Sequence, residues 1–176
     1  MRTALMIAAT AALLSGCAGM HGHDHGSGPS AIASLEPTRG NTAAGTVMFH
    51  STAGGVFMHA RLSGLKPGQE HGFHIHDKGD CSSGDGMSTG GHFNPTSKPH
   101  GAHGSADRHT GDLPSLKADA QGKADLRMVV SGPSIGSGAT NIIGRGLIVH
   151  ALPDDYTTQP TGNSGARIAC AVIAAR

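Results

Sequence analysis

Apolar and polar residues alternate with a period of two over most of the chain from about Ala31 onward. Successive side chains of a strand point to opposite faces, so this alternation predicts strands with one buried face. Turn sequences such as Ala53-Gly54-Gly55 and Lys66-Pro67-Gly68 separate the runs. The clearest strand candidates are residues 46–50, 56–62, 71–76, 124–130, 147–151 and 167–173.

Two long segments interrupt the predicted strands, at about residues 77–112 and 152–166. Loops of this length are uncommon in compact domains and usually carry function. The 28 Gly follow no collagen-like period and accompany few long helical patterns. The sequence therefore predicts one all-β domain over residues 31–176, an antiparallel β-barrel or sandwich with two long functional loops.

Residues 1–16 have the pattern of an export signal. Arg2 supplies a positive start, and the apolar run over residues 4–14 is too short to span a bilayer. Leu14-Ser15-Gly16-Cys17 resembles a lipobox, so we expect cleavage before Cys17 and a lipid on its thiol. Ala18 follows in place of Asp, which in similar lipoproteins implies the outer membrane where one exists. An ordinary secretory signal with an unrelated cysteine is the alternative.

A polar segment, residues 17–30, follows the predicted lipid attachment site. It has no apolar periodicity, which predicts a flexible tether. His21, His23 and His25 alternate in it with Gly and Asp, a pattern that could bind Cu(II), Ni(II) or Zn(II) weakly. A solvated linker without metal is equally consistent with this composition.

Charge and cysteine content narrow the classes further. A formal net charge of +1, without clustered Lys and Arg, argues against a nucleic-acid partner. Export implies an oxidising compartment, where disulfides persist. With Cys17 assigned to a lipid, Cys81 and Cys170 remain as a pair, and a bridge between them would close a loop of about 90 residues.

Histidine is unusually frequent, with 13 His against 13 Lys and Arg, and imidazole is the commonest metal ligand. His74 and His76 are two apart on a predicted strand, so both rings point to one face. Three imidazoles with one carboxylate suit tetrahedral Zn²⁺, and sites made only of imidazoles suit Cu(II). Other metal-binding side chains lie in the first long loop or end a predicted strand: His92, His100, His109, Asp112 and His150.

These residues stand in segments that resemble motifs of the copper-zinc superoxide dismutases, in particular the bacterial extracytoplasmic, lipoprotein type. The intervals also match that family, with 8 residues from His92 to His100, 9 to His109 and 3 to Asp112. The resemblance extends from about residue 31 to the end of the chain. The segments are Gly72-Phe73-His74-Ile75-His76, Gly79-Asp80-Cys81, Gly91-His92-Phe93-Asn94-Pro95, His100-Gly101, Arg108-His109, Gly111-Asp112-Leu113, Val149-His150-Ala151 and Thr161-Gly162-Asn163-Ser164-Gly165-Ala166-Arg167-Ile168-Ala169-Cys170.

The resemblance implies an eight-stranded Greek-key barrel with two metal sites that share one imidazole. Asp154 matches the carboxylate that orients one histidine of each site, and Arg167 matches the active-site arginine. Cys81 and Cys170 match the family disulfide. The implied copper ligands are His74, His76, His92 and His150. The implied zinc ligands are His92, His100, His109 and Asp112.

The implied activity is dismutation of superoxide to dioxygen and hydrogen peroxide, with His92 and Arg167 as catalytic residues. We expect a periplasmic or cell-envelope protein, held to the membrane through Cys17, that protects the envelope from superoxide formed outside the cytoplasm. The resemblance leaves a monomer and a homodimer open, and also allows a copper donor as partner. Residues 153–165 lack the acidic and Lys residues with which many relatives guide the anion.

Parts of the sequence also fit three other functions. A lipid-anchored copper or zinc store, or a copper chaperone, could use the same barrel. Gly132-Pro133-Ser134-Ile135-Gly136 fits a nucleophile elbow, but that elbow must join a strand to a helix, and here Gly138 follows and indicates a turn. A zinc hydrolase needs an open position on the metal, whereas this zinc set already has four ligands.

Four histidines fall outside the matched pattern. We expect His71 to pack structurally at the end of its strand. His103 lies close to His100 in the sequence and is an alternative zinc ligand. His50 and His59 are expected to be solvated.

Overall fold

The computed structural model describes residues 28–176. The predicted export signal, the lipid site Cys17 and the histidines His21, His23 and His25 lie outside these residues. Within the described part, nearly all regular structure is β, with one 3-10 turn, η1 (Met87–Thr89). No helix of this part is long and apolar enough to cross a membrane. The all-β prediction is confirmed.

Ten strands follow one another along the described chain. They are β1 (Ser30–Pro37), β2 (Ala44–Thr52), β3 (Gly55–Ser63), β4 (Glu70–His71), β5 (Phe73–His76), β6 (Leu116–Lys117), β7 (Ala124–Val130), β8 (Gly146–His150), β9 (Arg167–Val172) and β10 (Ala174–Ala175).

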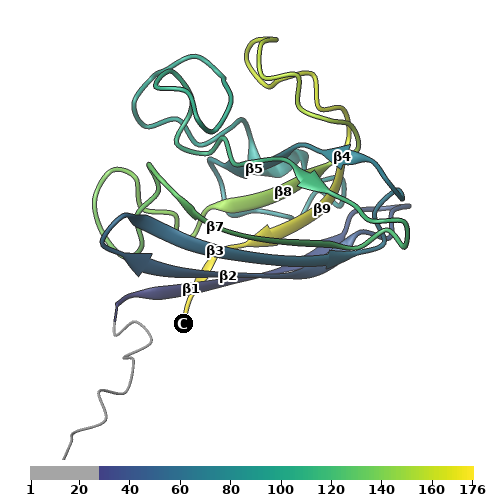
Figure 1. The fold of residues 1–176 in the computed structure, drawn as a ribbon, viewed down its shortest axis with the longest axis horizontal. Coiled ribbons are helices and arrows are strands. Elements are labelled where there is room, and N and C mark those ends of the chain that lie inside the picture. Colours follow the sequence, from purple (N-terminus) through teal and green to yellow (C-terminus); the bar gives the residue numbers. More distant parts are fainter. Residues whose placement is uncertain (1–27) are drawn as a thin grey trace, which may run out of the picture.

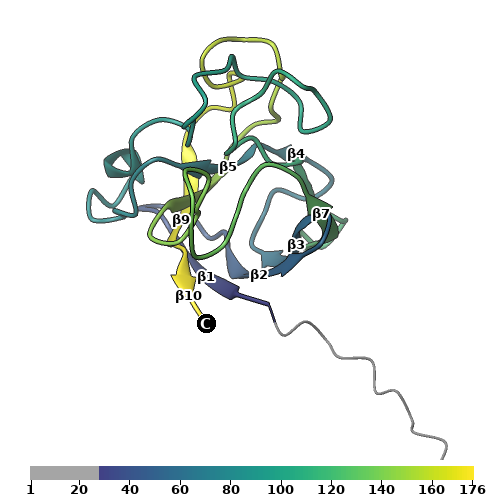
Figure 2. The same ribbon diagram turned by 90° about the vertical axis from the view of Figure 1, so that its left-hand side faces the viewer.

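Eight of these strands form one antiparallel sheet in the order β5-β8-β9-β1-β2-β3-β7, with β10 paired to β1. β4 and β6 form a separate pair. The large sheet curls on itself into a flattened barrel, seen from two directions in Figures 1 and 2. Neighbours such as β9 and β1 are far apart in the sequence, so the connections are of the Greek-key kind.

The core fills the inside of this barrel. Val56, Met58, Ala60 and Leu62 alternate along β3 with more exposed residues, and all four are buried. The same alternation on the other strands turns further apolar side chains inward, and Phe49 is among the largest that are fully buried. Burial of this apolar surface is the main force that stabilises the sheet.

The strands differ from the prediction most clearly at two places. β1 was not among the predicted strands, because its inward residues Ala31 and Ala33 give only a weak apolar signal. The strand predicted over residues 71–76 is divided at Gly72 into β4 and β5. A Cβ atom at Gly72 would lie 2.5 Å from the hydroxyl of Ser164, so the second long loop packs directly on the backbone there.

β5 carries apolar side chains on one face and imidazoles on the other. Phe73 and Ile75 belong to the core cluster. His74 and His76 point the opposite way, yet both are 0% exposed. Residues 77–115 and 151–166, the two long loops, reach over this face and exclude water from it (Figure 1). The loops therefore create a closed polar site on the outside of the barrel.

Candidate metal centre

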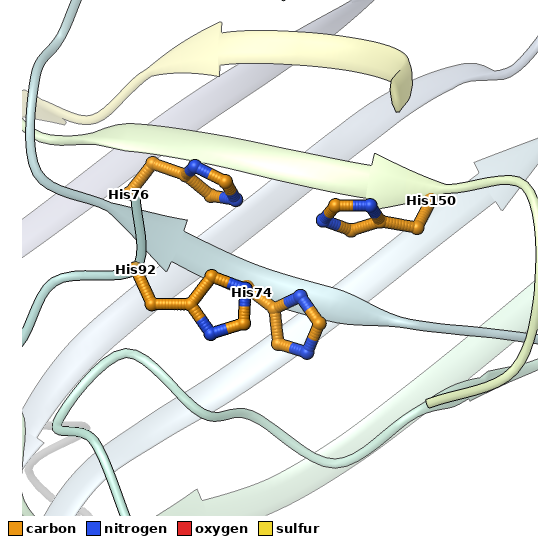
Figure 3. A group of neighbouring side chains, drawn as sticks. All are labelled: His74, His76, His92 and His150. Atoms are coloured by element: carbon orange, nitrogen blue, oxygen red, sulfur yellow. The ribbon is translucent and has the colours of Figure 1, made fainter. Parts of the chain in front are cut away.

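Four imidazoles converge on the covered face of the sheet: those of His74, His76, His92 and His150. Each offers one ring nitrogen, and the four nitrogens lie within 4.8 Å of one another. Figure 3 shows the rings directed toward a common point. β5 supplies the first two, the end of the neighbouring β8 supplies His150, and a backbone bridge between His76 and His92 brings the loop residue alongside.

In His76 and His150, a hydrogen bond of the second ring nitrogen determines which nitrogen carries the hydrogen. His76 Nδ1 donates to the carbonyl of Gly90 at 2.9 Å, and His150 Nδ1 donates to that of Gly165 at 3.1 Å. Since a carbonyl only accepts, each of these nitrogens carries the ring hydrogen, and the Nε2 atoms keep a lone pair.

The lone pairs have no partner within the protein. His74 Nδ1 and the Nε2 atoms of His76, His92 and His150 are buried without a hydrogen bond. Buried polar atoms are nearly always satisfied, so four orphaned nitrogens aimed at one point indicate a cation site. A set made only of imidazoles suits copper.

A second group of four donors lies next to the first: His92, His100, His109 and Asp112. Asp112 Oδ1 is 2.8 Å from His92 Nδ1, 3.1 Å from His100 Nδ1 and 3.2 Å from His109 Nδ1. The Nδ1 atoms of His92 and His109 are 3.4 Å apart. A tetrahedron with zinc–nitrogen bonds of the usual length has edges of roughly 3.3 Å. The group therefore has the dimensions of a tetrahedral zinc site.

Asp154 connects the two groups. Its Oδ2 accepts from His74 Nε2 at 2.6 Å, and its Oδ1 accepts from His100 Nε2 at 2.9 Å. In each ring the Nε2 atom therefore carries the hydrogen, and the Nδ1 atom keeps a lone pair that can bind a metal. Gly162 makes room for this arrangement, because a Cβ atom there would lie 1.8 Å from Asp154 Oδ1.

Sequence analysis missed Gln159, which holds the backbone of His100. Its side-chain oxygen accepts from the His100 amide at 2.8 Å, and its Nε2 donates to the His100 carbonyl at 2.9 Å. The second long loop is thereby fastened to the first at a metal ligand. Neither the residue type nor its position carries a metal-site signal, so only the structure could reveal it.

Burial keeps the imidazoles of His76, His92 and His150 neutral. It lowers the pKa of His150 to about 3, with a contribution from His74, and the pKa of His92 to about 4 against the opposing hydrogen bond to Asp112. The pKa of His76 also lies well below 6.5, because of burial, His92 and Arg167. Neutral imidazole is the form that binds a metal.

The second group combines opposite charges. Burial lowers the pKa of His100, but hydrogen bonds with Asp112 and Asp154 outweigh it and raise the pKa to about 9. Burial likewise raises the pKa of Asp112, and hydrogen bonds from His100, His109 and His92 bring it far below 3.8. Burial raises the pKa of Asp154 as well, but its hydrogen bonds with His100 and His74 outweigh burial and bring the pKa below 3.8. Both carboxylates are therefore ionised and available as ligand or acceptor.

Arg167 lies beside the first group, opposite His150 in the β8–β9 pairing. Its guanidinium donates to the carbonyls of Gly86 and Gly90, both at 2.7 Å, and to the hydroxyl of Thr89 at 2.8 Å. Besides burial, which is the main cause, its positive charge contributes to the lowered pKa of His76 and of His150. Burial lowers the pKa of Arg167, yet an arginine stays charged at physiological pH.

A disulfide between Cys81 and Cys170 fastens the same loop to β9, with Cα atoms 6.0 Å apart. Cys170 lies three residues after Arg167. The bridge and the three hydrogen bonds of Arg167 therefore fix one stretch of the loop over the covered face of the sheet.

The other histidines stay outside both groups. His71 is buried and its Nδ1 donates to the His150 carbonyl at 2.8 Å, as expected of a structural residue. His103 Nδ1 donates to the backbone carbonyl of Asp112 at 3.1 Å, so it supports the loop and is not part of the zinc set.

The segment around Ser134 is not a nucleophile elbow. The Ser134 hydroxyl donates to the carbonyl of Ser137 in an irregular loop, and no helix follows in the described chain.

Two adjoining, histidine-rich ligand sets lie buried under two loops on the outside of a Greek-key barrel. This combination defines a class of metal-binding β-barrels. The family model for copper/zinc superoxide dismutase (SODC) matches residues 43–173, and the chain belongs to that family. The resemblance seen in the motifs is thus confirmed, as is the Greek-key barrel that it implied.

Two of the similar proteins are described as dismutase-like, and a third is described as a clock protein. The superoxide dismutase-like protein YojM of Bacillus subtilis is 43% identical over 123 residues, which are 68% of this chain and 63% of that relative, less than two thirds of its length. A crystal structure of a SOD-like protein from Bacillus subtilis is 39% identical, covers 80% of this chain and 96% of that one, and has a TM-score of 0.73. The clock protein EA4 is 38% identical with a TM-score of 0.76 and covers 87% of this chain and 98% of its own.

Proposed function

We propose that this chain is an active superoxide dismutase, with copper held by His74, His76, His92 and His150. Zinc is held by His92, His100, His109 and Asp112. One observation carries the proposal: His92 turns one nitrogen toward the orphaned imidazole nitrogens and the other into the tetrahedral group. A protein that only stored metal would not need a single ring placed between two sites.

Bound copper would supply the redox chemistry, accepting an electron from one superoxide and giving one to the next, while zinc keeps a single oxidation state. His92 Nε2 is the atom that can hold a proton and pass it to the product. The side chain is only 1% exposed, and its Nδ1 is held by Asp112, so its free nitrogen has one orientation. A proton donor in fixed position contributes to catalysis by proximity and by its tuned pKa.

Arg167 would bind the substrate anion. Carbonyl oxygens and a hydroxyl hold the guanidinium from one side, which fixes it close to His76 and His150 without neutralising its charge. A positive charge at the entrance of a site attracts an anion and raises the association rate, and superoxide dismutases themselves are an example of this effect.

We further propose that the protein acts in the cell envelope as a lipoprotein attached through Cys17. The apolar run and the lipobox-like Leu14-Ser15-Gly16-Cys17 support this location. A disulfide, which persists in oxidising compartments, agrees with export. Superoxide formed outside the cytoplasm would then be the substrate, and a copper donor in the same compartment would load the site.

The test is superoxide consumption by the purified mature protein loaded with one equivalent each of copper and zinc. We expect fast catalytic decay by pulse radiolysis and a rhombic Cu(II) signal in electron paramagnetic resonance. The variant His92→Ala should keep the fold and lose most of the activity. Stoichiometric copper binding without accelerated decay of superoxide would show a metal-binding protein and refute the proposal.

A further inference from the structure

A surface cavity lies outside the metal centre, between the first long loop and the loop that follows β7. Its volume is about 150 Å³, and it is lined by Thr96, Lys98, Arg108, Thr110, Gly132 and Thr140. The lining thus offers two cations and three hydroxyl groups, and none of these six residues is acidic. Such a lining is complementary to an anion.

The two cations have no counter-charge. Within residues 28–176, neither Lys98 nor Arg108 forms an ion pair. Asp107, the nearest acid in the sequence, is exposed. Arg108 is partly buried, and burial of a charge without a partner is costly. An anion in the cavity would remove this cost.

The guanidinium of Arg108 is fixed but not saturated. One of its terminal nitrogens donates to the carbonyl of Ser131 and, at 3.0 Å, to the hydroxyl of the same residue. Its Nε is buried and has no hydrogen-bond partner. Arginine recognises oxyanions through its N–H groups, and the two hydrogen bonds to Ser131 leave part of the donor capacity of this side chain unused.

Two further residues shape the cavity for a ligand. Gly132 has φ +106, and a Cβ atom there would lie 3.4 Å from the Arg108 guanidinium, so the absent side chain leaves the cation accessible. Thr110 is only 6% exposed, yet it lines the cavity. Lys98 reaches across the loop, where its Nζ donates to the carbonyl of Ala106 at 2.5 Å.

We propose that this cavity binds a tetrahedral oxyanion of the phosphate or sulfate class. The volume corresponds to about five water molecules, which is enough for such an ion with part of its hydration and too small for a nucleotide. The ion would join residues 96–110 to the loop after β7 through Arg108, the neighbour of His109. The site is independent of the redox reaction, so it can be tested separately from the proposed activity.

The experiment is a calorimetric titration of the metal-loaded mature protein with inorganic phosphate, at constant ionic strength set with chloride. We expect saturable binding at one site, and amide shifts in nuclear magnetic resonance confined to the cavity, at Arg108, Gly132 and Thr140. Lys98→Met, which changes an exposed side chain, should weaken binding about tenfold or more, since a charged hydrogen bond is lost. Lys123→Met removes the same charge from an exposed turn and should leave binding unchanged.

Arg108→Met should also weaken phosphate binding, and Lys98→Met keeps the proposal testable if loss of the Ser131 contacts unfolds the loop. No saturable heat over the millimolar range, or unchanged binding in Lys98→Met, would overturn the proposal. A parallel titration with sn-glycerol 3-phosphate identifies the source of the ion. Binding of both ligands indicates that the site accepts a phosphate monoester, such as the headgroup of phosphatidic acid, and binding of inorganic phosphate alone indicates a free ion.

Discussion

Single neighbours outside the ligand sets determine how the metal-site side chains present their atoms. Backbone carbonyls orient His76 and His150, and Asp154 orients His74 and His100. The side chains that form the two groups could be predicted from the sequence, because His and Asp at matched spacing carry a chemical signal. The carbonyl partners could not, since any residue type supplies a carbonyl and only the fold decides which one lies near a ring.

At Arg167 we predict a loss of rate with little loss of copper. Arg167→Ala should lower the second-order rate constant roughly tenfold or more and flatten its dependence on salt. Electrostatic steering raises the association rate of an anion by a factor of this order, and dissolved ions screen the effect. Arg167→Lys keeps the charge and should retain the salt dependence. Pulse radiolysis at several ionic strengths measures both, with resonance spectra to check the copper.

The matched control is Arg61→Ala, which removes the same charge from an exposed position on β3. It should change the rate little. Equal salt dependence in wild type and Arg167→Ala would show that this guanidinium does not guide the substrate.

A second prediction at this scale concerns Gln159. Gln159→Met has a similar volume but loses both hydrogen bonds to the His100 backbone. Loss of an outer partner of a metal ligand typically costs about 10–100-fold in metal affinity, so zinc affinity should fall by this order. Chelator competition measures the affinity, and Gln121→Met, at an exposed turn position, is the control. Wild-type zinc affinity in Gln159→Met would contradict the prediction.

At the scale of elements, the metal centre forms where the two long loops cover one face of the sheet at β5. The strands with large apolar residues, such as β3 and β8, could be predicted from their alternation, and both long loops were expected between strands. β6 and β10 have two residues each, too few to give a periodic pattern. The packing of the loops on β5 could not be predicted from periodicity, because it depends on contacts far apart in the chain.

The disulfide is the strongest single link between a loop and a strand. Replacement of both Cys81 and Cys170 by Ser should lower the free energy of unfolding by roughly 2–5 kcal/mol, since the bridge closes a loop of about 90 residues. Urea denaturation of the metal-free protein measures this change. A double variant as stable as the wild type would show that the two cysteines do not constrain the unfolded chain.

For the molecule as a whole, the buried imidazoles make stability depend on pH. In the folded, metal-free protein the pKa of His92 is about 4 and that of His150 about 3, and that of His76 is also lowered. In the unfolded chain these histidines titrate near 6.5. Below that pH the unfolded state therefore binds protons that the folded state does not.

We predict that the metal-free protein becomes less stable as the pH falls from 6.5 to about 5. Each of the three histidines contributes up to about 1.4 kcal/mol per pH unit. His100, with its pKa raised to about 9, stays protonated in the folded state and gains its proton in the unfolded chain as the pH falls through 6.5. It therefore opposes this slope by about half of one histidine's contribution at pH 6.5 and by very little at pH 5. The carboxylates, with lowered pKa values, are ionised in both states and add no slope. Urea denaturation at several pH values measures the slope, and a rise in stability toward pH 5 would contradict it.

The hydrogen bonds of Asp154 to His74 and His100 have a thermodynamic consequence. One carboxylate is shared by a ring of each ligand set, so ordering it from one side prepares it for the other. Linkage requires the effect to be mutual: if zinc tightens the binding of copper by some factor, copper tightens the binding of zinc by the same factor. The order in which the ions arrive would then change the intermediate that is formed, but not the total free energy of assembly.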